Sequence, residues 1–160
     1  MKYFTEEIWD FEGYQKHLFS LKETLDEDTF DFLQTNSFHD GILCDITVHN
    51  PYTEKTEDIK SSIVFVTAKI KHWNGQVYTL LWKNVTVYQF DFNISRNKVV
   101  ETNEILFDRG LDEWSHDELT LNEENKMQHE IDFFSKTRLL IECSDFSIGL
   151  LDSLDNNCSF

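Results

Sequence analysis

The sequence predicts an α+β fold in which two amino-terminal helices pack on a curved, mainly antiparallel β-sheet. Three observations predict it. Apolar residues recur at helical spacing before residue 36, they alternate with a period of two after Gly41, and an Asn-Gly pair at 74–75 marks a tight hairpin turn. Strands that are polar on one face are typical of antiparallel sheets rather than of the doubly covered parallel sheet of a nucleotide-binding fold.

The predicted helical part spans residues 11–35. Its first apolar residues are four, three and four positions apart, along one side of a helix: Tyr14, Leu18, Leu21 and Leu25. The acidic run at 26–28 suits the start of a second short helix, because carboxylates cap free N–H groups and face the positive end of the helix dipole. Phe30 and Leu33 form the expected buried face of this second helix.

The predicted sheet part spans residues 41–148, and it follows the junction Ser37-Phe38-His39-Asp40-Gly41. In the first strand one face is expected to be apolar: Ile42, Cys44, Ile46 and Val48. The other face is expected to be mostly wet, with Leu43 as its one aliphatic residue. Residues 50–58 read as a polar loop.

A hairpin is the strongest local prediction. A strand over 63–70 buries Val64, Val66, Ala68 and Ile70, turns at 72–76, and folds back on residues 77–87. Lys83-Asn84 is expected to be a bulge in the return strand. Residues 93–104 are expected to be irregular or an edge segment, and residues 108–114 are expected to make one helical turn with Leu111 and Trp114 inward.

The last third is predicted to be a three-stranded meander over residues 118–121, 128–134 and 138–148, followed by a frayed tail over 152–160. In the middle strand the expected buried face comprises Met127, His129, Ile131 and Phe133.

Length and cysteine content indicate one cytoplasmic domain covering residues 1–160. The chain has 160 residues, which suits one sizeable core, and three unclustered cysteines, which fit buried thiols in a reducing compartment. Neither a signal peptide nor a membrane-spanning run is visible, so we expect no membrane association. The oligomeric state stays open.

The net charge of −16 at pH 7 predicts a basic partner and argues against nucleic-acid binding. Carboxylates concentrate over residues 101–124, where the bland interpretation is a solvated face and the functional one is a patch that steers a basic protein. The candidate partner-binding residues are Asp112, Glu113, Trp114, Asp117, Glu118, Glu123 and Glu124. Trp82 and Trp114 are the candidate aromatic anchors of that interface.

Catalytic signatures are missing from the sequence, so we expect a non-catalytic protein without metal or cofactor. There is no His-Glu-x-x-His pair, no Gly-x-Ser-x-Gly elbow and no glycine-rich phosphate loop. His39-Asp40 stands at the start of the first strand and is the alternative site, for a small ligand or an enzyme reaction. The structural interpretation of His39 is a half-buried side chain that ties the helices to the sheet by hydrogen bonds.

Three short motifs carry a resemblance: the Ser37–Gly41 junction, Leu-Trp-Lys-Asn-Val at 81–85, and Asp-Phe-Ser-Ile at 145–148. With the order of helices and strands over residues 14–148, the chain resembles small bacterial domains of the type that act as immunity proteins against secreted polymorphic toxins. The resemblance implies binding to a basic toxin domain, and it carries no active-site residues. The segment 93–104 is longer than the pattern implies.

Overall fold

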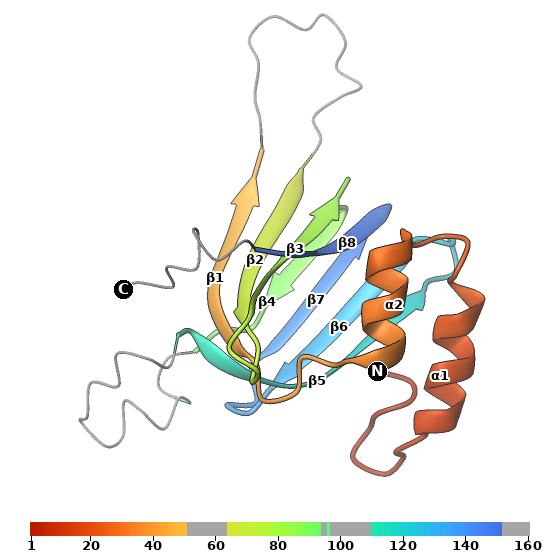
Figure 1. Cartoon of the computed structure of the whole chain (residues 1–160), viewed down its shortest axis with the longest axis horizontal. Coiled ribbons are helices and arrows are strands. Elements are labelled where there is room, and N and C mark those ends of the chain that lie inside the picture. Colours follow the sequence, from red (N-terminus) through yellow and green to blue (C-terminus); the bar gives the residue numbers. More distant parts are fainter. Residues whose placement is uncertain (51–63, 94–95, 97–109, 152–160) are drawn as a thin grey trace, which may run out of the picture.

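The computed structural model describes residues 1–50, 64–93, 96 and 110–151, and it shows an α+β fold (Figure 1). Its helices are α1 (Phe11–Ser20) and α2 (Glu27–Thr35). Its strands are β1 (Ile42–His49), β2 (Phe65–Lys71), β3 (Val77–Lys83), β4 (Val87–Phe90), β5 (Asp112–Leu121), β6 (Met127–Phe133), β7 (Arg138–Cys143) and β8 (Asp145–Leu150). The predicted loop at 51–58, most of the segment 93–104 and the tail 152–160 lie outside the described residues.

All the strands belong to one antiparallel sheet of eight strands in the order β4-β7-β6-β5-β1-β2-β3-β8, which is not closed. The sheet is strongly curved, and both helices lie on one side of it (Figure 1). Two sharp bends lie next to each other, since the Asn84 side chain donates to Ser144 Oγ at 2.7 Å and Lys83 pairs with Asp145 at 2.9 Å. The first bend connects β3 to β4, and the second connects β7 to β8. Each one therefore leads the chain from one end of the strand order to the other.

The helices form where the sequence predicts them, and aspartates cap both. Asp10 accepts from the Gly13 N–H at 2.8 Å and Asp26 accepts from the Thr29 N–H at 2.9 Å, so each satisfies a donor that the helix itself cannot pair. The predicted burial is confirmed for all six residues: Tyr14, Leu18, Leu21, Leu25, Phe30 and Leu33. The first helix is shorter than its stripe predicts, since α1 ends at Ser20, Leu21 is its C-cap and Leu25 lies in the turn before α2.

Side chains from the helices also pair with backbone groups that the sheet leaves free. The Leu119 N–H of β5 donates to Tyr14 Oη at 2.9 Å, and the Ile148 N–H of β8 donates to Thr29 Oγ1 at 2.9 Å. Unpaired strand edges invite association with other chains, and a covering helix is one way to protect them. The helices therefore pair free backbone N–H groups of β5 and β8, and they also bury an apolar stripe.

The first strand corrects one predicted face. Leu43, expected on the wet face, is fully buried, and Val48, expected on the apolar face, is about half exposed. The burial of Leu43 follows from a β-bulge, because the register with β2 shifts between Leu43 and Asp45 and places Leu43 on the same face as Ile46, opposite the buried residues of β2. Val48 stays on the face of Ile46, opposite Val66, and is exposed near the end of the strand.

The β2–β3 hairpin is confirmed, with Gly75 at a φ of 85° in its turn and with Val66, Ala68 and Ile70 buried. The expected bulge at Lys83-Asn84 is instead the end of β3, since β4 pairs with β7 and not with β2 or β8. Asn84 has a φ of 52°, a conformation that asparagine tolerates better than most residues. The strand turns away at this position.

Two further predictions are wrong in detail. The helical turn expected at 108–114 is wrong over its described part, because β5 begins at Asp112 and continues to Leu121. The strand expected over 138–148 is two strands, since Ser144 separates β7 from β8 and β8 pairs with β3. The meander of β5, β6 and β7 is confirmed, as is the buried face of β6.

The described part of the chain contains no helix that is long and apolar enough to cross a membrane.

Candidate functional site

The predicted acidic face is not an outer surface in β5. Asp112, Trp114 and Glu118 are all buried, and Trp82 is buried as well, so neither tryptophan is available as an interface anchor. The prediction failed because β5 is a central strand: the core covers one of its faces, and the amino-terminal residues cover part of the other. Of the remaining predicted residues, Glu113 is half-buried, while Glu123 and Glu124 are exposed in the turn that leads to β6.

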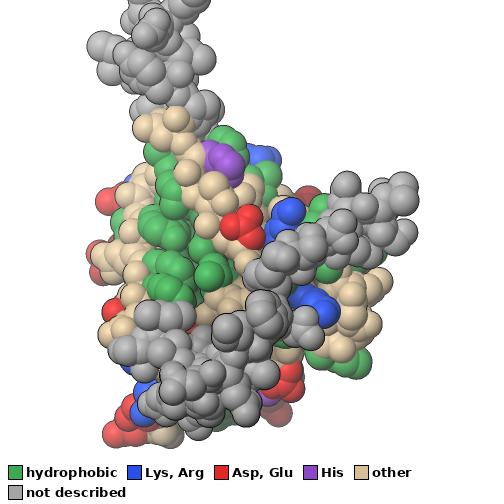
Figure 2. Space-filling model, turned by 90° about the vertical axis from the view of Figure 1, so that its left-hand side faces the viewer, with side chains coloured by type: hydrophobic (Ala, Val, Ile, Leu, Met, Phe, Trp, Pro, Cys, Tyr) green, Lys and Arg blue, Asp and Glu red, His purple; other side chains and the backbone are tan. Residues whose placement is uncertain are grey.

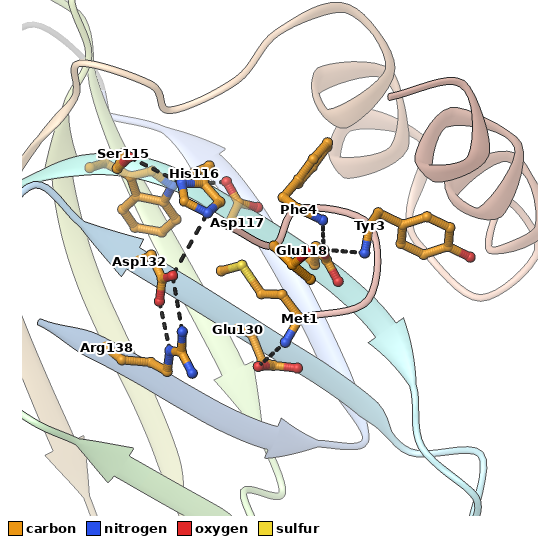
Figure 3. A network of polar contacts seen from close by, with 12 residues as sticks. Met1, Tyr3, Phe4, Ser115, His116, Asp117, Glu118, Glu130, Asp132 and Arg138 are labelled. Carbon is orange, nitrogen blue, oxygen red and sulfur yellow. Dashed lines mark hydrogen bonds and ion pairs between the residues drawn. The ribbon is translucent and has the colours of Figure 1, made fainter. Parts of the chain in front are cut away.

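Glu118 holds the amino-terminal segment, residues 1–9, on the sheet. Its carboxylate is 1% exposed and accepts from the backbone N–H groups of Lys2 and Tyr3 at 2.6 Å each and from that of Phe4 (Figure 3). A buried carboxylate is costly unless donors surround it, and here one side chain satisfies three consecutive backbone groups. The buried Glu118 is therefore a structural anchor.

A row of polar side chains crosses β5, β6 and β7 beside this segment (Figure 3). His116, Asp132 and Arg138 are register partners, and Arg138 donates to both oxygens of Asp132, at 2.8 and 3.2 Å. The Met1 amino group pairs with Glu130 at 2.7 Å. The Trp9 ring lies 5.2 Å from the His116 ring, so the far end of the segment rests on the same row.

Asp117 belongs to a different network, inside the core. Trp114 Nε1 donates to Asp117 Oδ1 at 2.8 Å, and His129 Nε2 lies 3.0 Å from Asp117 Oδ2. Trp82 Nε1 lies 3.1 Å from His129 Nδ1. Because an indole N–H only donates, Nδ1 of His129 accepts, and the ring is neutral with its proton on Nε2. Trp114 and His129 thus give Asp117 two neutral donors, and Trp82 fixes the tautomer of His129.

A cavity of about 340 Å³, which we call the groove, lies between the helices, the amino-terminal segment and β5. Its walls are mostly apolar and include Phe4, Trp9, Phe11, Leu18, Phe32 and Phe38. Its polar lining comes from Gln15, Asn36, Ser37, His39, Ser115, His116 and Asp117. A cavity of this size with few polar groups has the character of a small binding site.

His39 and Asp40, the alternative site, lie at the edge of the groove. His39 is a groove residue, and its Nδ1 hydrogen-bonds to the Ser115 carbonyl, as expected for a histidine that ties the junction to the sheet. Its side chain is nevertheless 57% exposed, and it pairs with Asp40 at 3.4 Å. Asp40 has a φ of 61° in the turn before β1. The pair thus has both a bracing contact and an adjacent cavity.

Ser115, His116 and Asp132 stand in an order that resembles a nucleophile, a base and an orienting acid. Ser115 Oγ is 3.0 Å from His116 Nδ1, but the 3.7 Å from His116 Nε2 to Asp132 Oδ2 is too long for a hydrogen bond. Both oxygens of Asp132 also accept hydrogen bonds from Arg138. The arrangement lacks the oriented base that nucleophilic catalysis requires. No group of three metal-ligating side chains occurs among the described residues.

Cys143 supplies a prediction about pH. Burial raises the pKa of its thiol to about 12, against an ordinary value near 9. Between these values the unfolded chain loses a proton that the folded chain keeps, so the free energy of unfolding falls as pH rises from about 9, by up to about 1.4 kcal/mol per pH unit. Measured by urea unfolding between roughly pH 8.5 and 10.5, the free energy of unfolding should fall more steeply with pH for the parent chain than for Cys143→Ala. Equal slopes would contradict the assignment.

Several exposed apolar side chains lie in the amino-terminal part. Trp9 is 66% and Phe11 59% exposed, with Ile8 between carboxylates of the same segment. Residues 6–31 carry nine exposed carboxylates. Four of them adjoin these aromatics in sequence, and the other five follow later in the chain: Glu6, Glu7, Asp10 and Glu12, then Glu23, Asp26, Glu27, Asp28 and Asp31. Against these nine stand three lysines in residues 1–31, which gives this part a net charge of −6. We call residues 6–31 the acidic helical surface.

The side of the molecule away from the helices has a different character. Figure 2 shows that its described hydrophobic side chains gather in one band, with the acidic ones mostly toward the margins. The acidic helical surface therefore lies on another side of the molecule from this band (Figures 1 and 2).

In comparisons with known proteins, no family model, curated protein or solved structure matches the chain. The fold and the candidate site are therefore interpreted from the chain's own geometry.

Sequence reasoning missed the site's main elements for a definable reason. Trp9 precedes the first helix, and Phe11 is its first residue, three positions before Tyr14, so it continues the stripe that predicts a buried side although it is exposed. The available signal was the pair of large aromatics next to Glu6, Glu7 and Asp10. The groove itself depends on the packing of α1 and α2 against β5, which no local pattern specifies.

Proposed function

We propose that the chain is a non-catalytic, protein-binding domain that recognises a basic protein through the acidic helical surface. The observation that carries this proposal is the coincidence of exposed Trp9 and Phe11 with exposed carboxylates next to them in the sequence and with an adjacent groove. In the specific form of the proposal the partner is the basic domain of a secreted toxin, and the chain neutralises it in the cytoplasm as an immunity protein.

Exposed apolar side chains at this position support an interface. A partly exposed tryptophan contributes a large contact area at little entropic cost, and tryptophan is enriched among residues that dominate binding energies. Phe19 extends the apolar surface along α1, where it is 63% exposed and its ring lies 6.2 Å from that of Phe30. Removing such apolar side chains from water is favourable, so a partner that covers them gains binding free energy.

The surrounding charge supports a basic partner. A net charge of −6 over residues 1–31 repels phosphates and attracts cationic protein surfaces, which raises association rates and disfavours acidic partners. For the same reason we propose no nucleic-acid ligand. Complementary exposed charges act mostly on the association rate and lose strength with salt.

The test is a titration calorimetry experiment with the toxin domain encoded beside the chain's gene, at low and at physiological salt. We expect a one-to-one complex that weakens as salt rises. Reversing two exposed charges, Glu6→Lys with Glu7→Lys, should weaken binding about tenfold or more, because it places like charges opposite the basic partner. Asp10 is left unchanged because it caps α1.

The matched control is Glu123→Lys with Glu124→Lys, which changes the net charge equally at an exposed adjacent pair on the β5–β6 turn. It should leave the affinity within about twofold, since it lies outside the acidic helical surface. Equal losses in the two double variants would contradict the proposed location. Reversal at Glu113, Asp117 or Glu118 would test the fold rather than the surface, because these side chains are half-buried or buried.

A small-ligand or enzymatic role near His39 and Asp40 is the second candidate, and one observation favours it: the groove opens beside His39. Under this alternative a small molecule would occupy the groove without any protein partner. His39→Ala would then abolish ligand binding, whereas a basic protein bound at the acidic helical surface would lose at most a rim contact.

A further inference from the structure

We infer that the groove receives the cationic side chain of a lysine or arginine of the partner, and that Asp117 is the carboxylate that receives it. The inference rests on the proposed function and specifies its chemistry. It starts from the position of Asp117, which lines the groove and is only 13% exposed.

Asp117 lacks a cationic partner within the described part of the chain. Its two oxygens contact Trp114 Nε1 and His129 Nε2, and the imidazole is neutral because Trp82 donates to its other nitrogen. The ion pairs that lysines and arginines form among the described residues involve other carboxylates. A largely buried carboxylate held only by neutral donors is costly, and a cation placed against it recovers part of that cost.

The walls of the groove suit a side chain with an aliphatic stem and a charged end. Phe4, Leu18 and Phe38 supply an apolar lining, and exposed Trp9 supplies a ring face that attracts cations at the entrance. Each oxygen of Asp117 has a lone pair beyond the one already used, so it can accept from an ammonium or a guanidinium group.

The charge outside the groove selects the same occupant. Glu6, Glu7 and Glu12 flank the exposed aromatics in sequence, and all three are exposed. An approaching basic segment would meet these carboxylates first, and its lysine or arginine would then replace water against Asp117. An acidic or neutral side chain would leave Asp117 buried and uncompensated, so the arrangement discriminates by charge.

The direct test uses two ligands of one shape. n-Butylguanidinium carries the positive charge of an arginine side chain, and N-butylurea is its neutral counterpart. Binding to the unmodified chain is followed by its tryptophan fluorescence and by chemical shifts of the Trp9 indole N–H and of the amides of residues 115–117. We expect the cation to bind about tenfold more tightly than the urea, since a charge-assisted contact is roughly twice as strong as a neutral one. Equal affinities, or shifts confined to the β5–β6 turn, would overturn the inference.

A variant pair gives the second arm. Asp117→Asn should remove the preference for the cation, while Glu123→Gln, which changes an exposed charge outside both the groove and the acidic helical surface, should retain it. Because asparagine places an NH₂ group against one of the two donors of the network, Asp117→Asn can unfold, and the comparison of the two ligands on the unmodified chain still decides the question. Retention of the preference in folded Asp117→Asn would also overturn the inference.

The outcomes separate this inference from the proposed function. A cation preference in the groove without any complex with the basic toxin domain would support the inference as a small-cation site and would remove the proposed function. A salt-sensitive complex with the toxin domain, without a cation preference in the groove, would leave the proposed function and remove the inference.

Discussion

Glu118→Ala should lower the free energy of unfolding by about 3–5 kcal/mol, one of the two largest single-residue effects that we expect. The substitution leaves the backbone N–H groups of Lys2, Tyr3 and Phe4 without their shared acceptor. Either these groups stay buried and unpaired, or residues 1–9 detach and Phe4 loses its place in the core. Both routes are costly, and urea unfolding monitored by circular dichroism measures the loss.

Two variants calibrate the Glu118 result. Glu118→Gln keeps one oxygen acceptor and removes the charge, so it should cost about 1–3 kcal/mol, less than the alanine variant. Glu123→Ala removes an exposed carboxylate just beyond the same strand and should stay within about 0.5 kcal/mol of the parent chain. A Glu118→Ala chain as stable as Glu123→Ala would show that the segment is not anchored there.

His129→Leu is expected to cost a similar amount, about 3–5 kcal/mol. Leucine fills a similar volume, but it leaves Trp82 Nε1 without an acceptor and Asp117 Oδ2 without a donor inside the core. A loss of this size from a substitution that adds apolar surface would identify the polar network, rather than packing, as the cause. Urea unfolding and the near-ultraviolet circular dichroism of the buried tryptophans report it.

The matched control is His49→Leu. His49 lies on the outer face of β1, where its ring stacks on Phe65 at 4.5 Å and one nitrogen contacts Thr67 Oγ1 at 3.1 Å. Because that position is only half-buried, the same substitution should cost about 1 kcal/mol or less. A larger loss at His49 than at His129 would contradict the network described for Asp117.

Glu118 also connects stability with recognition. The carboxylate anchors the segment whose far end carries Trp9, and Trp9 is both a groove residue and the most exposed aromatic of the acidic helical surface. A variant that releases this segment is therefore expected to lose partner affinity as well as stability. Such coupling would not arise from an interface on the β5–β6 turn.

The fold was largely predictable because its signals are local. The period of apolar residues specified both helices, and the Asn-Gly pair specified the β2–β3 hairpin. The errors have tertiary causes. Leu43 is buried because a bulge shifts the register of β1, and β3 and β7 end where they do because each bends at the junction of Asn84 with Ser144. Neither event changes the pattern of apolar residues along the chain.

The candidate site was predicted less well, because acidic residues do not reveal from sequence which of them a fold will cover. Asp117 and Glu118 look alike in a run of carboxylates, yet one lines the groove and the other is buried under residues 1–9. Burial of Glu118 depends on a contact between positions more than 100 residues apart. The alternative hypothesis requires a cavity near His39, and His39 lines the groove while it also has the bracing contact of the structural interpretation.

The most direct measurement of the central claim is amide hydrogen exchange of the chain alone and in complex with the proposed partner, a basic toxin domain. The account predicts that protection gained on binding is concentrated at residues 5–20 and at residues 115–117, which frame the groove. Protection confined to the β5–β6 turn at Glu123 and Glu124, with unchanged exchange around Trp9, would contradict it.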